Sequence, residues 1–172
     1  FTSSPEELAR ALPRAAVRPV DVGMVRFEEV ERPFLLWCGA GYDAVVIDQL
    51  NTSRTGHMGI TGLLRNAPGV LRAIARYPAP PIRAELDGLR VDDADSVILA
   101  NVAEVAFGRT VVDSADPFDG RLDVVSVDRA SPLKLVGLGL RMLVSGLGGS
   151  SGTRHQFATR VRLSSDGVVP VQ

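Results

Sequence analysis

The sequence predicts an α+β fold, mainly an antiparallel β-sandwich with about three helices. Three observations lead to this prediction: short β-branched and aromatic runs outnumber helical stretches, Asp, Gly and Pro turns separate those runs, and no regular strand–helix–strand alternation is found. The chain has 172 residues, of which 45% are hydrophobic, so residues 1–172 can form one domain that buries a core.

Helix signals occur at three places. Residues 4–7 are typical of a helix start, because a capping serine is followed by a proline in the first turn and a glutamate that closes a capping box. Between residues 60 and 74 apolar side chains recur at helical spacing with arginines on the opposite face, and Pro68 is expected to kink or divide this helix. Ser131 followed by Pro132 indicates the start of a third helix.

Strand signals dominate the rest of the chain. Two runs that flank an acidic turn predict a hairpin, at residues 17–27 and 33–38. Further short strands are predicted at residues 82–86, 97–102 and 122–127. Residues 155–163 alternate between apolar and polar side chains, which predicts one strand with one solvent-facing side.

Composition and charge exclude several classes of function. Nineteen basic and twenty acidic residues give a formal charge of −1, so no overall field attracts nucleic acid and no nucleic-acid partner is expected. Cys38 is the only cysteine, which excludes an internal disulfide and fits a cytoplasmic protein. The longest apolar stretch, residues 133–147, contains Lys134 and Arg141 and is too short to span a bilayer. Both ends of the chain are expected to be cuts through a longer polypeptide.

Common catalytic motifs are missing from the sequence. It has neither a P-loop nor a G-x-G-x-x-G segment after a strand, so we expect another segment to hold most of any ATP. Residues 148–152 match G-x-S-x-G, but the predicted helix-to-strand order is the reverse of a nucleophile elbow. Two distant histidines and one cysteine do not make a zinc site.

Asp43 follows two glycines at the end of a strand-like run. Gly39 and Gly41 would let the backbone turn tightly or approach a ligand closely. A simpler interpretation stays open, and the residues alone favour it: Asp43 caps the helix that follows.

Four aspartates crowd one turn-rich segment: Asp113, Asp116, Asp119 and Asp123. Their spacing does not match an EF-hand loop, but one carboxylate together with backbone carbonyls would suit a hard cation. A polar turn that starts a strand, with Gly120 at a positive φ, is an equally good interpretation.

In order along the chain, four segments resemble landmarks of the C-terminal lobe of the bacterial diacylglycerol kinase and lipid kinase family, which is related to NAD kinases and sphingosine kinases. Residues 18–23 resemble its "pvDvG" strand, 39–44 its "GiGfDA" turn, 100–101 its "vaN" strand and 115–123 its "A...DGlLD" segment. Residues 170–172 resemble the approach to its "DGE" motif. The resemblance runs through most of the chain and implies the substrate-side lobe of a two-lobed lipid kinase.

The chain also departs from the family pattern. Of the family's glycine-rich "GGG..iaP" only Gly108 remains within residues 102–114, and Arg121 replaces the usual leucine of "DGlLD". The family's "GGDGT" and "DGE" motifs are not in this chain, so we expect the nucleotide-binding lobe to be absent here. No catalytic residue is expected in the chain, and the catalytic carboxylates are expected just beyond Gln172.

The resemblance implies transfer of the ATP γ-phosphoryl group to diacylglycerol or a similar lipid alcohol, with Mg²⁺ as cofactor. At the acidic turn it implies a magnesium site made by the Asp119 side chain and the main-chain carbonyls of Asp116 and Arg121. It also implies that three residues bind the substrate: Asp43, Arg54 and His57. A solvated face is the more ordinary interpretation of the last two.

For the whole polypeptide, the resemblance implies a cytoplasmic phosphotransferase of lipid metabolism and phospholipid biosynthesis that contacts the membrane surface peripherally. This lobe alone is expected to be inactive, and a homodimer stays open. The altered segment 102–114 keeps a second interpretation open, a non-catalytic lipid-binding or regulatory module derived from the same fold. The residues do not identify the lipid.

Overall fold

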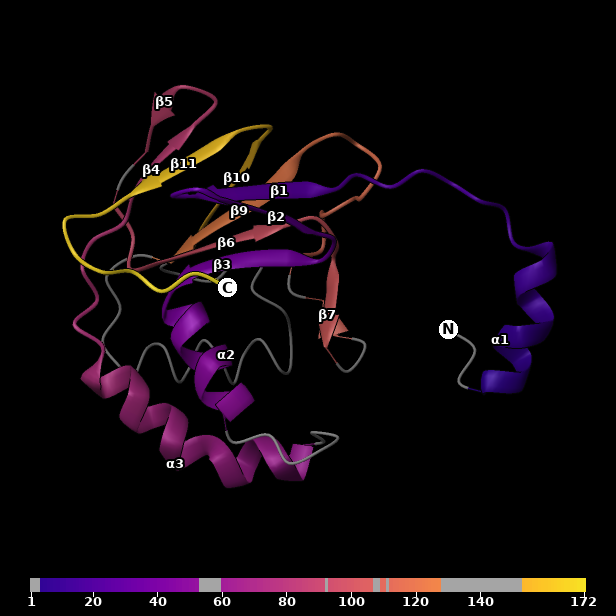
Figure 1. Ribbon diagram of the computed structural model, residues 1–172, viewed down its shortest axis with the longest axis horizontal. Helices are drawn as coiled ribbons and strands as arrows, with labels where there is room; N and C mark the ends of the chain where they lie inside the picture. The colour runs from indigo at the N-terminus through magenta and orange to yellow at the C-terminus, as the bar shows by residue number, and fades with distance from the viewer. Residues whose placement is uncertain (1–3, 53–59, 92, 107–108, 111, 128–152) are drawn as a thin grey trace.

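In the computed structural model the chain forms a β-sandwich with two helices packed against one side (Figure 1). The structure describes residues 4–52, 60–91, 93–106, 109–110, 112–127 and 153–172. Within these ranges every strand pair is antiparallel. The predicted α+β class is therefore confirmed.

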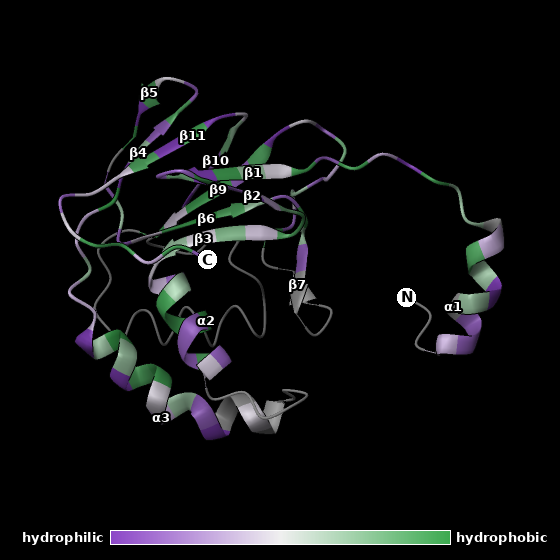
Figure 2. Cartoon of the chain, viewed as in Figure 1, coloured by the Kyte–Doolittle hydropathy of each residue, from purple (hydrophilic) through white to green (hydrophobic). Residues whose placement is uncertain are grey.

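A four-stranded central sheet carries the core. Its strands, in spatial order, are β10 (Thr153–Ala158), β9 (Leu122–Val127), β6 (Ser96–Ala100) and β3 (Trp37–Gly41). β6 is buried along its whole length and β9 along almost all of it. Figure 2 shows both strands as mostly hydrophobic, as expected of strands that are covered on two faces.

A second layer of strands lies over one face of the central sheet (Figure 1). It contains a three-stranded sheet of β11 (Val161–Ser164), β4 (Arg83–Leu86) and β5 (Leu89–Arg90). It also contains a hairpin of β1 (Gly23–Phe27) and β2 (Val30–Phe34). A separate short hairpin pairs β7 (Glu104–Ala106) with β8 (Arg109–Thr110).

Two helices cover the opposite face. α2 (Tyr42–Thr52) contacts β3, β6 and α3 (Ile60–Arg76), and α3 continues through Pro68 without a break. α1 (Pro5–Ala11) and the 3₁₀ turn η1 (Leu12–Arg14) stand apart from the sandwich at the end of an extended segment (Figure 1). The helix predicted at Ser131 lies outside the described residues. None of the helices in the described part of the chain has the length and apolar composition that crossing a bilayer needs.

Buried side chains form one cluster on each face of the central sheet. The larger cluster lies between the two layers and joins Cys38, Ala40, Val97, Leu99 and Val124 to Ile82 and Leu86. The smaller cluster lies on the other face and contains Ile98, Ala100, Val112, Ala115 and Val125. Successive residues of β6 therefore point into different clusters, which explains why its sequence is apolar without alternation.

Three predicted strands have different boundaries in the structure. The predicted strand 17–27 is shorter, because β1 begins only at Gly23. Residues 155–163 belong to two strands, β10 and β11, which lie in different sheets. The chain turns between them at Thr159 and Arg160, whose main-chain N–H groups donate to the Asp87 carboxylate at 3.1 and 2.8 Å. The predicted strand 33–38 is also divided, because β2 ends at Phe34 and β3 begins at Trp37. The first interruption is the polar pair Thr159 and Arg160, whereas the second is the apolar pair Leu35 and Leu36, and neither break changes the apolar pattern.

Candidate functional site

A cavity of about 570 Å³ lies between the two layers of the sandwich. Most of its wall is apolar and comes from six strands, with side chains that include Val25, Phe34, Cys38, Leu99, Val161 and Leu163. Three cationic residues also line it: Arg26, Arg121 and Arg160. A concave apolar site with a few polar groups is the usual form of a small-molecule binding site.

One wall of the cavity includes the segment that leads into β1. Asn101, at the end of β6, is only 2% exposed, and its Nδ2 donates to the main-chain oxygens of Asp21 and Leu35, each at 2.9 Å. The main-chain N–H of Asp21 donates to the Pro117 carbonyl oxygen at 2.8 Å. These bonds hold Asp21 between β6 and the acidic turn.

The acidic turn, residues 113–123, contributes Gly120 and Arg121 to the cavity wall. Asp21 Oδ2 accepts a hydrogen bond from the Gly120 N–H at 2.7 Å, and Asp119 Oδ1 accepts one from the Arg121 N–H at 2.9 Å. Gly120 has φ +72°, as the turn interpretation of the sequence predicts. The turn is therefore built by bonds between carboxylates and backbone amides.

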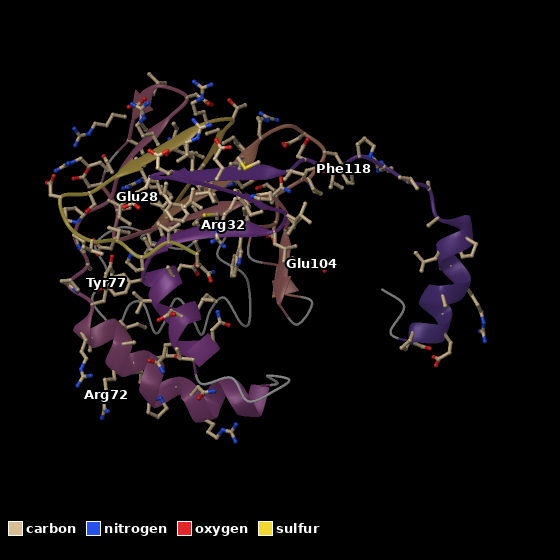
Figure 3. The ribbon with its side chains drawn as sticks, viewed as in Figure 1. Glu28, Arg32, Arg72, Tyr77, Glu104 and Phe118 are labelled. Atoms are coloured by element: carbon tan, nitrogen blue, oxygen red, sulfur yellow. The ribbon has the colours of Figure 1, made fainter. Side chains whose placement is uncertain are left out.

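Phe118 connects this turn to the extended N-terminal segment. The guanidinium of Arg18 lies 4.2 Å from the centre of its ring, and Figure 3 shows Phe118 where the extended segment leaves the sandwich. The Phe118 N–H donates to Asp116 Oδ1 at 3.1 Å. Asp116, Asp119 and Arg121 thus share one turn beside the cavity, and magnesium binding by them stays a prediction.

Asp43 lies in the first turn of α2, and its side chain folds back over β3. A Cβ atom on Gly39 would lie 1.8 Å from Asp43 Oδ2, so glycine is needed to leave room for the carboxylate. Oδ2 is buried and has no hydrogen-bond partner among the residues that the structure describes. The Asp43 N–H donates to Ser96 Oγ at 3.2 Å, and α2 begins one residue earlier, at Tyr42. The interpretation that Asp43 caps this helix is therefore wrong.

The carboxylate of Asp43 and the cavity lie on opposite sides of β3. Cys38 belongs to the cluster between the layers. Because side chains alternate along a strand, a Cβ atom on Gly39 would point to the opposite face of the sheet, where the Asp43 carboxylate lies. Gly39 exchanges two main-chain hydrogen bonds of 3.0 Å with Gln172. Asp43 and the last residue of the chain therefore meet at the same edge of the central sheet.

Burial raises the pKa of Asp43 from 3.8 to about 6, and a hydrogen bond from the Gln172 side chain opposes only part of this rise. The folded state favours the neutral carboxyl of Asp43. The free energy of unfolding therefore contains a contribution from this group that is full below about pH 4 and is lost as the pH rises to about 6. We predict that Asp43→Asn removes this loss. Relative to the variant, the free energy of unfolding of the wild-type chain should fall by about 3 kcal/mol between about pH 4 and pH 7. Urea unfolding across this range checks the prediction, and parallel profiles would contradict it.

A second buried carboxylate, Asp123, fixes the end of the acidic turn. It is 1% exposed, and its Oδ1 accepts a hydrogen bond from the Ser114 hydroxyl at 2.5 Å and lies 2.6 Å from His155 Nε2. Ser114 Oγ is also 3.4 Å from the same ring nitrogen. In a catalytic triad the two nitrogens of the imidazole face different partners, so this arrangement is not a nucleophile relay. It joins the turn to β9 and β10.

The structure brings together only part of the predicted site. Three of the predicted residues share the acidic turn: Asp116, Asp119 and Arg121. Asp43 lies across β3 from the cavity. The other two predicted residues lie outside the described part of the chain: Arg54 and His57.

Sequence reasoning gave no site role to three buried or bridging residues: Asp21, Asn101 and Asp123. Each belongs to a family-like segment, "pvDvG", "vaN" or "A...DGlLD", and these segments are neighbours in space at one wall of the cavity. The presence of each residue in a family-like segment could have pointed to it, but the sequence does not indicate which of these segments contact one another.

Comparison with known proteins agrees with this architecture. Residues 37–172 match the family described as the YegS C-terminal NAD kinase beta sandwich-like domain. No match was found among curated protein sequences.

Three solved structures from Bacillus anthracis str. Sterne are similar in fold. One, a diacylglycerol kinase, has a TM-score of 0.61 and 17% identity, and the match covers 96% of this chain and 50% of that one. Two more, provisionally assigned as diacylglycerol kinases, have TM-scores of 0.63 and 0.64 and identities of 17% and 18%. They are matched over 96% of this chain and over 53% and 52% of their own lengths.

The chain therefore spans about half the length of the solved structures it resembles. At sequence identities of 17–18%, the structural similarity shows that the folds are alike. The family match covers most of the chain, including the central sheet, the three-stranded sheet and the acidic turn. The chain belongs to the YegS C-terminal NAD kinase beta sandwich-like domain family.

Proposed function

We propose that the polypeptide containing this chain is a lipid kinase that transfers the ATP γ-phosphoryl group to diacylglycerol or a similar lipid alcohol. This chain would be its substrate-side lobe. Family membership and the names of the similar structures support a phosphotransferase of this kind. The observation that carries the proposal is the apolar cavity between the layers, because a lipid tail needs an apolar site away from water.

The cavity suits a ligand with an apolar tail and a polar head. Its volume of about 570 Å³ lies inside the range of roughly 300–1,000 Å³ for small-molecule sites. The tail would lie against side chains such as Val25, Leu99 and Leu163. Arginine guanidinium groups bind ester oxygens well, so the ester groups of the lipid would lie towards Arg26 and Arg160.

The edge of β3 would face the reacting groups. Because Gln172 pairs with Gly39, the residues that follow it in a longer polypeptide would start beside Asp43. Since the Asp43 carboxylate lies across β3 from the cavity, we assign to it a contact with the lipid hydroxyl alone, where the head group would reach past this edge. A carboxyl group whose pKa is about 6 can accept a hydrogen bond when ionised and donate one when neutral. Phosphate contacts of Arg54 and His57 stay predictions.

ATP and Mg²⁺ would be held mainly by the other lobe. Magnesium bound to the nucleotide neutralises charge that develops during phosphoryl transfer, and a carboxylate accepts the proton of the attacking hydroxyl. In this division the present lobe binds and orients the lipid and keeps water from its tail. Access to the lipid would come from peripheral contact with the membrane surface.

Phosphorylation of lipid alcohols by the full polypeptide tests this proposal. With γ-labelled ATP, Mg²⁺ and mixed micelles that contain diacylglycerol, ceramide or a sphingoid base, we expect a labelled phospholipid product from at least one lipid. No labelled lipid from any of them would contradict the kinase proposal. Saturable binding of a fluorescent lipid without any product would instead favour the non-catalytic lipid-binding module.

A further inference from the structure

We infer that the guanidinium of Arg121 takes the place of a divalent cation at the acidic turn, so that this turn folds without a bound metal. Cation sites of this kind depend on a carboxylate that is free to coordinate. In this chain the Asp119 carboxylate, at the centre of the turn, is already paired with the positive charge of Arg121. The inference does not depend on the phosphoryl-transfer reaction proposed above.

Both oxygens of Asp119 face groups of Arg121. Oδ1 accepts the main-chain N–H of Arg121 at 2.9 Å, and Oδ2 lies 3.5 Å from its Nη2. The Asp119 side chain is 23% exposed and the Arg121 side chain 53%, so the carboxylate is partly shielded from water but the guanidinium is not. Arg121 thus supplies Asp119 with a hydrogen bond from its main chain and a positive charge from its side chain.

An aromatic ring holds the guanidinium from another direction. The Cζ atom of Arg121 lies 5.4 Å from the centre of the Phe157 ring, within cation–π range. Phe157 in turn packs against the edge of the His155 ring, with centroids 4.9 Å apart and planes at 61°. His155 is tied to the buried Asp123. The positive charge is therefore positioned by contacts to β10 as well as by Asp119.

Two neighbouring carboxylates, Asp116 in the turn and Asp21 beside it, are also bound to backbone N–H groups. Asp116 Oδ1 accepts the Phe118 N–H, and Asp21 Oδ2 accepts the Gly120 N–H. Among the described residues, no three His, Cys, Asp or Glu side chains gather into a metal-binding group. A divalent ion bound by the Asp119 carboxylate and the main-chain carbonyls of Asp116 and Arg121 would lie beside a like-charged guanidinium. It would also find no free carboxylate at Asp116 or Asp21 on the oxygens already bound to backbone.

Leucine, which the family motif has at position 121, would remove the guanidinium and leave the Asp119 carboxylate open on one side. The inference therefore predicts that Arg121→Leu makes the fold respond to metal. Arg162→Leu is the matched control, because Arg162 is an exposed arginine for which the described part of the chain shows no ion pair.

The test compares thermal unfolding of the nucleotide-free full polypeptide in EDTA and in millimolar Mg²⁺. We expect the Tm of the wild type and of Arg162→Leu to differ between the two conditions by less than about 1 °C. Arg121→Leu should have a lower Tm in EDTA and should gain about 5 °C in Mg²⁺. Adding Asp119→Asn to that variant should abolish the gain.

Metal analysis of the wild type decides the question if Arg121→Leu does not fold. We expect purified wild-type protein to carry no stoichiometric Mg²⁺ or Ca²⁺ after extensive dialysis and to keep its Tm in EDTA. One equivalent of retained metal whose removal lowers the Tm, and whose retention Asp119→Asn abolishes, would overturn the inference. A metal response of equal size in the wild type and in Arg121→Leu would overturn it as well.

Discussion

Replacing Gly41 with alanine is expected to lower the free energy of unfolding by about 3–5 kcal/mol. Gly41 ends β3 with φ +86°, a conformation that alanine rarely adopts. Its new Cβ would also lie 2.3 Å from the Asp95 main-chain oxygen and 3.1 Å from Ser96 Cα. Because both neighbours are backbone atoms of the β6 region, the two strands would have to separate to make room. Urea unfolding of the wild type and the variant measures the effect.

Gly88→Ala is the matched control for this prediction. Gly88 has φ +88° in the turn between β4 and β5, but a Cβ atom there would meet no atom within 4 Å. The substitution should therefore show the conformational cost alone, about 1 kcal/mol. Equal losses at Gly41 and Gly88 would contradict the claim that the contact of β3 with β6 is tight at this point.

In the full polypeptide, Asp43→Asn is expected to lower kcat/KM for the lipid by about 10- to 100-fold, the range expected for loss of one hydrogen bond to a charged group. The same substitution should not lower stability at neutral pH, because it removes a carboxyl group that is costly to ionise when buried. Activity lost without loss of stability separates a functional role from a structural one. Steady-state kinetics with a soluble short-chain lipid, together with urea unfolding, measures both effects.

Asp48→Asn is the control on the same helix, since Asp48 is exposed on α2. It should leave kcat/KM unchanged. Gly39→Ala should reproduce the activity loss of Asp43→Asn, because the added methyl group would displace the Asp43 carboxylate. Unchanged activity in Asp43→Asn would show that this carboxylate does not contact the substrate.

The sequence predicted the type of fold well because its strongest signals are local. The uninterrupted apolar run of β6 and the capping signals at residues 4–7 depend only on neighbouring residues, and both elements are present. The turn at Thr159 and Arg160 could not be predicted in the same way. It depends on Asp87, a residue far away in sequence whose carboxylate binds the backbone of the turn, and the apolar alternation continues through it.

Less of the candidate site could be predicted. The acidic turn was recognisable because its aspartates and Gly120 are close in sequence, and its positive φ is confirmed. Its link to Asp21 and Asn101 joins three distant segments, so no local pattern contains it. The cavity depends on how far apart the two layers stand, which follows from all the side chains between them. The direction of the Arg121 side chain likewise depends on Phe157 in β10.

The central claim is that the cavity between the layers receives the apolar tail of a lipid substrate. Chain-length dependence of lipid phosphorylation by Val161→Phe tests it most directly, because Val161 lines the cavity from β11. Arg162→Phe is the control, since it places the same ring on the exposed side of the same strand. We predict that Val161→Phe raises KM for a long-chain lipid alcohol at least about tenfold but changes KM for a short-chain analogue little, and that the control changes neither. Equal effects of Val161→Phe on both lipids, or no effect on either, would contradict the claim.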